Sequence, residues 1–192
     1  MVEGQEGIAQ KVAVTPDREW ANLKKLYRRT YFRRVWMTQE IAVNKEVDII
    51  CGKSSLPWDS LDKAIENINY RRYLFNPASN LKVDDSSFDC IQGISYVRKN
   101  YQQNISDPTG IDFLDILDMA RKLQATDPRD KVFAMVRFRG KLQHIMPDYG
   151  ISVTPSEVFK NMVQSFIEIG SLDIILHCGR RQQPNIPSWC PD

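Results

Sequence analysis

A tryptophan and a glutamate four residues apart, Trp36 and Glu40, form the spacing in this sequence with the clearest chemical potential. A carboxylate beside an aromatic wall can hold ribose hydroxyls and stabilise positive charge that develops at a glycosidic carbon. The same residues suit a structural role, in which the indole packs in a core and the carboxylate bonds to a backbone amide or an arginine. Both interpretations stay open from the spacing, and the structural one is favoured.

The segment from Tyr31 to Lys45 must position this pair, and its pattern predicts one amphipathic helix. Side chains at alternating steps of three and one share a face: Phe32, Val35, Trp36, Gln39, Glu40 and Val43. We therefore expect Glu40 on the core-facing side. A buried carboxylate is costly unless it is paired, and no neighbour three or four residues away is basic. Its partner is expected from another segment, unless the carboxylate lines a cleft.

The rest of the chain is predicted to be helical apart from one short strand at Glu46–Cys51, which is followed by a Gly-Lys-Ser-Ser turn. Helices are expected over 17–27, 56–73, 88–101 and 111–124, and over 155–167 behind a Thr154–Glu157 capping box. A short helix is expected with Asp127 at its N-cap and Pro128 at its first position, where charge-assisted hydrogen bonds of Arg129 and Asp130 would pin the turn. Gly93 is expected to interrupt or weaken its helix. The fold class is α+β and predominantly helical, with one strand pair at most; residues 1–16 form a flexible entry and 17–192 a single domain.

Composition is that of an ordinary globular protein, with 192 residues, 42% hydrophobic and 26% charged residues, and a net charge of +2. No apolar run is long enough for a membrane helix, and the first residues do not resemble a signal peptide. The spacing of Cys51, Cys90, Cys178 and Cys190 fits free thiols rather than a metal site. We expect a cytosolic or nuclear setting, with cytoplasm as the predicted location and no membrane partner.

A basic segment and a lone histidine also bear on function. Six basic residues lie among aromatics between Lys24 and Arg34, and a nucleic-acid surface is one interpretation. A solvated helix face with its aliphatic stems on apolar neighbours is favoured. His177, which lies among aliphatic residues, is interpreted as a satisfied core histidine rather than a catalytic one.

Several of these segments together resemble the fungal heterokaryon-incompatibility (HET) domain. The resemblance rests on YFRRVWMTQEIAV, VDIICGKSSLPWDSL, ATDPRDKVFAMV, MPDYGISVTPSEVF and IPSWCPD, which occur in the family's order from about residue 18 to 192. The family's first strands and its Trp-Ile-Asp-Ala-Leu-Cys-Ile-Asn-Gln motif are not found. The chain therefore resembles the C-terminal half of a TIR-like α/β HET domain, with few strands.

The resemblance implies a module of fungal nonself recognition that leads to programmed cell death through contacts with other signalling domains or with itself. HET domains are distantly similar to TIR domains, in which a glutamate after a Trp-x-x-x-Glu spacing serves NAD hydrolysis. This similarity would make Glu40 the catalytic carboxylate and Trp36 the wall of the NAD site, with NAD as substrate and no bound cofactor. Such activity is expected only when the N-terminal half is present. Helices that normally pack on that half are expected to expose an apolar patch.

Overall fold

The computed structural model describes residues 22, 25–74, 85–107, 112–142, 145–178 and 186–191, and these residues form a mostly helical α+β fold. The predicted fold class is confirmed. The expected flexible entry at 1–16 lies outside the described residues. No helix in the described part of the chain is long and apolar enough to cross a membrane.

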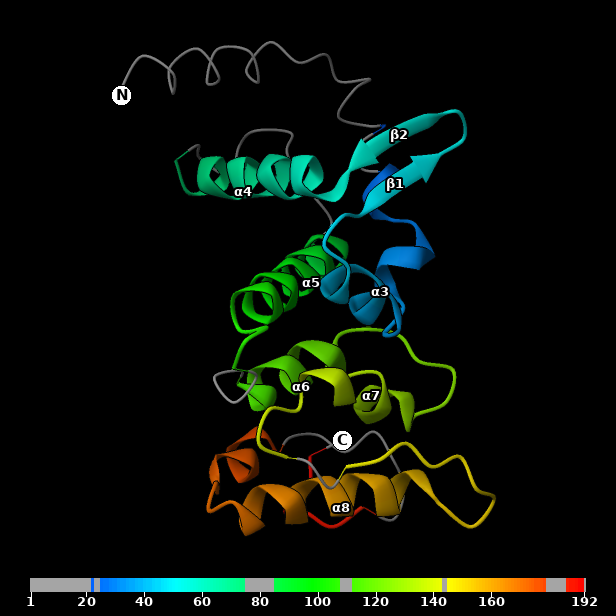
Figure 1. Cartoon of the computed structure of the whole chain (residues 1–192), viewed down its shortest axis with the longest axis vertical. Helices are drawn as coiled ribbons and strands as arrows, with labels where there is room; N and C mark the ends of the chain where they lie inside the picture. Colours follow the sequence, from blue (N-terminus) through cyan, green and yellow to red (C-terminus); the bar gives the residue numbers. More distant parts are fainter. Residues whose placement is uncertain are drawn as a thin grey trace.

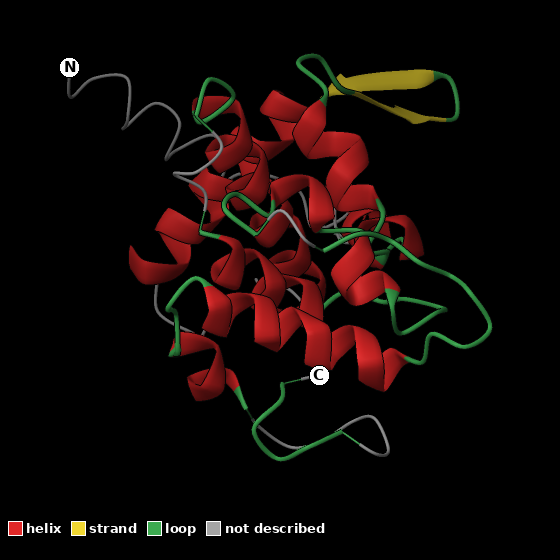
Figure 2. Cartoon of the chain, turned by 60° about the horizontal axis from the view of Figure 1, so that its bottom comes forward, coloured by secondary structure: helices red, strands yellow, loops and turns green. Residues whose placement is uncertain are grey.

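The elements stack from the hairpin and α4 at one end of the molecule to α8 at the other, as Figure 1 shows. In chain order they are η1 (Thr30–Arg33), α3 (Met37–Val43), β1 (Asp48–Cys51), β2 (Ser54–Pro57), α4 (Trp58–Leu74), α5 (Asp85–Gln103), α6 (Phe113–Arg121), α7 (Asp130–Phe133), η3 (Val136–Phe138), α8 (Pro155–Glu168) and η4 (Asp173–His177). The strand pair projects from the helical body (Figure 2). Helices therefore supply most of the positions from which side chains can converge.

The two strands form an antiparallel hairpin around Gly52 and Lys53, so the turn is shorter than the predicted Gly-Lys-Ser-Ser and its serines belong to β2. Cys51 pairs with Ser54, and Asp48 pairs with Pro57 at the open end. Gly52 adopts a φ of +63°, a conformation that a glycine reaches without a Cβ clash. The strand begins two residues later than predicted, and its partner had not been predicted as a separate strand.

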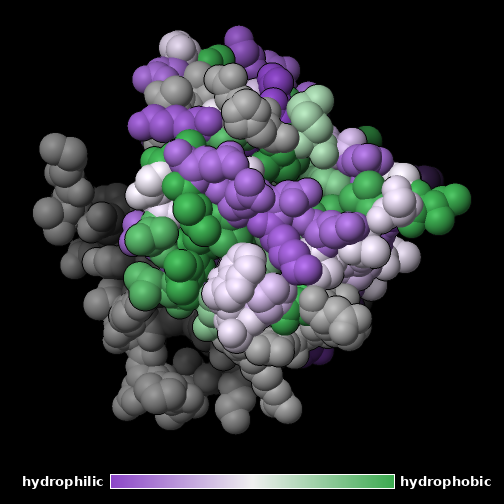
Figure 3. Space-filling model, turned by 90° about the horizontal axis from the view of Figure 1, so that it is seen from below, coloured by the Kyte–Doolittle hydropathy of each residue, from purple (hydrophilic) through white to green (hydrophobic). Residues whose placement is uncertain are grey.

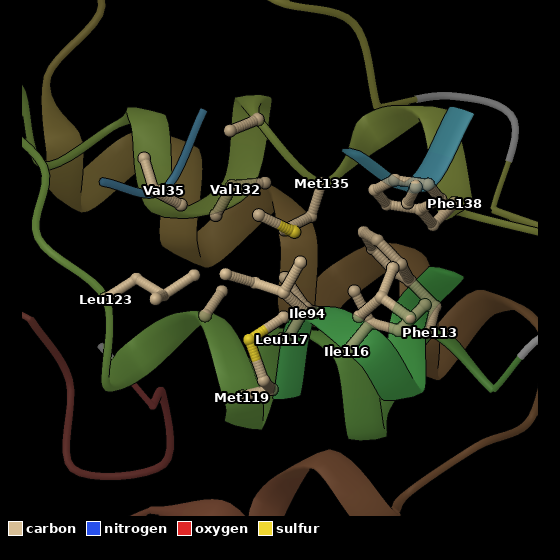
Figure 4. Packing of buried hydrophobic residues seen from close by; sticks show 14 of the residues in the cluster. Val35, Ile94, Phe113, Ile116, Leu117, Met119, Leu123, Val132, Met135 and Phe138 are labelled. Atoms are coloured by element: carbon tan, nitrogen blue, oxygen red, sulfur yellow. The ribbon is translucent and has the colours of Figure 1, made fainter. Parts of the chain in front are cut away.

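Helix α5 is central to the core and contacts α3, η1, α4 and α6. Its inward side chains are fully buried: Phe88, Ile91, Ile94 and Val97. Figure 4 shows Ile94 among side chains from α6, α7 and η3, with Met135 and Leu117 near it. The hydrophobic surface removed from water here holds the helices in place.

Gly93 does not interrupt α5, contrary to the sequence prediction. A Cβ at this position would overlap Met119 Cγ of α6. Glycine is therefore needed for the close approach of α5 and α6, and the cost of its backbone entropy is offset by packing.

The predicted capping box at the start of α8 is confirmed. The Thr154 hydroxyl accepts from Glu157 N at 3.3 Å, while the Glu157 carboxylate accepts from Thr154 N at 2.7 Å. Both halves of the capping box are present. Asp112 caps α6 by accepting from Leu114 N at 3.0 Å.

Candidate functional site

The segment that carries Trp36 and Glu40 is not one continuous helix. After η1, the backbone of Arg34 is extended, with φ −77° and ψ 131°, and forms a parallel bridge with Gln124. Val35 N donates to Gln124 O at 2.9 Å. Helix α3 begins only at Met37, so the long helix predicted from Tyr31 is wrong in its first half.

This break changes which side chains of α3 face the core. The buried residues of α3 are Met37, Thr38, Ile41 and Ala42. Glu40 is exposed, so the prediction that its carboxylate turns inward is wrong. The predicted face assumed one helical phase from Phe32 onward, whereas the extended residue at Arg34 resets the phase. Phe32 and Val35 remain 1% exposed, but they reach the core from outside α3.

The exposed Glu40 carboxylate has a defined partner. Tyr31 Oη donates to Glu40 Oε2 at 2.7 Å across the break. Partial burial, and then the neighbouring carboxylate, raise the pKa of Tyr31 to about 12, so this phenol stays protonated at neutral pH. The contact fixes one oxygen of Glu40 at the surface.

Trp36 is the N-cap residue of α3 and is only partly buried, with its side chain packed against the hydrophobic core. Glu40 N donates to Trp36 O at 3.4 Å, so the two residues lie one helical turn apart. Tyr31, Trp36 and Glu40 thus belong to one stretch of surface. An accessible carboxylate next to a half-buried indole is compatible with a ligand contact as well as with a purely structural role.

The C-terminus of α3 is held by two side chains of α5 that the sequence did not single out. Arg98, which is 8% exposed, donates to the carbonyls of Ile41 and Lys45, each at 2.7 Å, and to that of Asn44. Gln102 Nε2 donates to Ala42 O at 2.8 Å. These donors satisfy carbonyls that a helix end leaves unpaired. The partners are 53 to 60 residues apart, so no local pattern could have revealed them.

The Asp-Pro-Arg-Asp segment forms a structural clasp. Arg129 binds Asp127 through two nitrogens, with the shorter contact at 2.7 Å, and donates to Val153 O at 2.9 Å. Tyr149 donates to Asp130 Oδ1 at 2.6 Å and lies under the Arg129 guanidinium. The predicted pinning of this turn by Arg129 and Asp130 is confirmed. The predicted helix start is wrong, because α7 begins at Asp130 with Arg129 as its N-cap, rather than at Pro128 behind Asp127.

His177 lies at the edge of a hollow rather than in the core. Its Nδ1 is 3.4 Å from Asp118 Oδ1, and Arg121 Nη1 donates to its carbonyl at 2.8 Å. The hollow has a volume of about 30 Å³ and mostly apolar walls, including Leu117, Phe159, Met162 and Ile174. These contacts tie η4 to α6, and the histidine is satisfied as predicted, although its side chain is half-buried.

The basic segment lies beside a second hollow of about 180 Å³, which is lined by Arg33, Asp89, Cys90, Lys122 and Gln124. Burial raises the pKa of the Cys90 thiol, and nearby Arg33 opposes this shift. A thiol of raised pKa is a weak nucleophile. Arg28, Arg29 and Arg34 are exposed, whereas Lys24 lies outside the described residues.

All four cysteines are free thiols, as predicted. Among the residues that the structure describes, no group of three His, Cys, Asp or Glu side chains could hold a metal ion. Trp36 and Glu40 line neither of the two hollows described above.

Comparison with known proteins found no match: no family model, no curated protein and no solved structure is similar to this chain.

Proposed function

We propose that this chain is a signalling module of fungal nonself recognition, of the HET-domain kind, which acts through protein contacts and leads to programmed cell death. The resemblance of its ordered motifs suggests this class. Within the motifs, the Asp127–Arg129 clasp and the Thr154–Glu157 box are occupied in holding the fold together. Polar groups engaged in this way support an interaction module better than a catalytic one.

The observation that carries the proposal is a cluster of aliphatic side chains in contact with water at the end of α8 and in η4. We call it the α8–η4 patch; its members and exposed fractions are Ile167 (45%), Ile169 (48%), Leu172 (61%), Ile175 (40%) and Leu176 (82%). Clustered exposed apolar side chains mark protein interaction sites.

Expression in a filamentous fungus from an inducible promoter tests this function. We expect growth arrest from the chain, either alone or joined to an N-terminal half of a HET domain, and loss of arrest in Leu172→Asp. Ile50→Asp is the matched control, because Ile50 is 76% exposed on the hairpin at the other end of the molecule. Absence of arrest in both forms, at normal protein levels, would contradict the proposal.

A second candidate, a TIR-like NAD-cleaving hydrolase, is favoured by one observation. The Glu40 carboxylate is accessible, held by Tyr31 and one helical turn from Trp36, which suits an acid that stabilises a developing oxocarbenium ion. The resemblance implies turnover only in a form that includes the N-terminal half. Such a form should release nicotinamide from NAD and lose this activity in Glu40→Gln at unchanged folding. Equal turnover in both proteins would remove Glu40 from the mechanism.

A further inference from the structure

The α8–η4 patch is held in a fixed shape. Gly170, with φ +81°, ends α8, and Ser171 N donates back to Phe166 O at 2.9 Å. Ile174 is fully buried and anchors η4, while Arg121 holds its far end through the His177 carbonyl at 2.8 Å. Little ordering entropy is therefore lost when a partner covers the patch. Figure 3 shows apolar side chains gathered on this face beside a strip of hydrophilic ones.

Charges of both signs border this apolar surface. A hollow of about 310 Å³ adjoins the patch, shares Ile169 with it, and is also lined by Arg139, Lys141 and Asp173. Lys141 and Asp173 are both exposed. A partner for this surface must therefore offer apolar side chains together with one basic and one acidic group.

We propose that the partner is a second copy of this chain, bound patch to patch across a two-fold axis with Lys141 of each copy facing Asp173 of the other. In an isologous contact the same surface serves both sides, so a surface that carries both charges beside its apolar centre is complementary to itself. Complementary charges fix the register, while the aliphatic side chains supply most of the attraction. The inference rests on the proposed signalling function and names its partner.

Light scattering and sedimentation of the purified chain across the micromolar range test the dimer. We expect mass to rise from monomer to dimer with concentration, because association of two copies follows mass action. Leu172→Asp should abolish the dimer and Ile50→Asp should preserve it. A monomer at every concentration, or equal effects of the two substitutions, would overturn the proposal.

Reversal of the charges at Lys141 and Asp173 tests how the two copies are oriented. Lys141→Glu alone and Asp173→Lys alone should each place like charges opposite one another and weaken the homodimer about tenfold or more. Mixing the two variants should restore a dimer of one copy of each, seen by native mass spectrometry, because both contacts then join opposite charges. If Lys141 and Asp173 paired within one copy instead, neither variant could form that pair, and mixing the variants would not restore it. Failure of the mixture to pair would therefore exclude the stated register.

The dimer and the signalling function can fail separately. Growth arrest that is lost in Leu172→Asp, in a protein that stays monomeric at every concentration, would overturn the dimer and leave the patch as a site for a different protein. A dimer without arrest would retain the interface and refute the signalling role.

Discussion

Tyr31 donates a 2.7 Å hydrogen bond to Glu40 across a break in the helical phase. The phenol belongs to η1 and the carboxylate to α3, so the contact joins two elements whose backbones are separated by the extended residue Arg34. It also explains how an exposed carboxylate keeps a defined position.

The Tyr31–Glu40 contact predicts a dependence of stability on alkaline pH. The folded pKa of Tyr31, about 12, lies above the ordinary value near 10. The contribution of the protonated Tyr31 hydroxyl to the free energy of unfolding is therefore complete below about pH 10 and is lost as pH rises through about 12. Tyr31→Phe should remove this part of the loss of stability at alkaline pH. Glu40→Gln should lower the pKa of Tyr31 only partly, because burial is the larger cause of its shift. Denaturant unfolding from pH 8 to 12, with NMR titration of Tyr31, would measure both.

Arg98 predicts a large loss of stability on substitution. Arg98→Met would leave the carbonyls of Ile41, Asn44 and Lys45 without their donor in a mostly buried site, and we expect the free energy of unfolding to fall by about 2–4 kcal/mol. Lys99→Met is the matched control. Its side chain is half exposed and pairs with the exposed Glu66 and the mostly buried Asp62, so its loss should cost less than that of Arg98, about 1 kcal/mol. Similar urea midpoints for the two variants would contradict this role of Arg98 in holding the C-terminus of α3.

Gly93 predicts a steric effect that a second substitution can relieve. Gly93→Ala introduces a Cβ into the space of Met119 Cγ and should destabilise the protein by about 1–3 kcal/mol. In the Met119→Ala background the same change should be less costly, or even favourable, because alanine is the better helix former. A double-mutant cycle by thermal unfolding measures this coupling, and additive losses would disprove the close approach.

Asp127 predicts a dependence of stability on acidic pH. Hydrogen bonds from Arg129 lower the pKa of the Asp127 carboxyl. The clasp therefore contributes stability that is present above the ordinary aspartate pKa and is lost as pH falls through the lower folded value. Asp127→Asn should lower the melting temperature at pH 7 and flatten its decline between about pH 4 and 2. Parallel declines in the two proteins would contradict this assignment.

Local sequence signals predicted the features that depend on near neighbours. The capping box of Thr154 and Glu157 marked the start of α8, and Gly52 marked the end of β1, because these contacts are made within a few residues. The pinning of the 127–130 turn by Arg129 and Asp130 was likewise predicted from neighbouring positions. The mostly helical fold class followed from the periodicity of the longer helices.

The candidate site could not be predicted in this way. The expected orientation of Glu40 was wrong, because Arg34 leaves the helical conformation to pair with Gln124, which is ninety residues away in sequence. A pairing over that distance has no local signature. Arg98 escaped notice for the same reason, since a basic residue on a helix is usually exposed.

The sequence by itself determined the longer helices, the capping box of α8, the approximate position of β1 and the free cysteines, because each depends on the conformational preferences and spacing of nearby residues. Only the tertiary structure decided the phase of α3, the exposure of Glu40, the anchoring of Arg98 and the outward aliphatic side chains of η4. Burial and backbone pairing between distant segments control these features, and they arise only when the whole chain has packed.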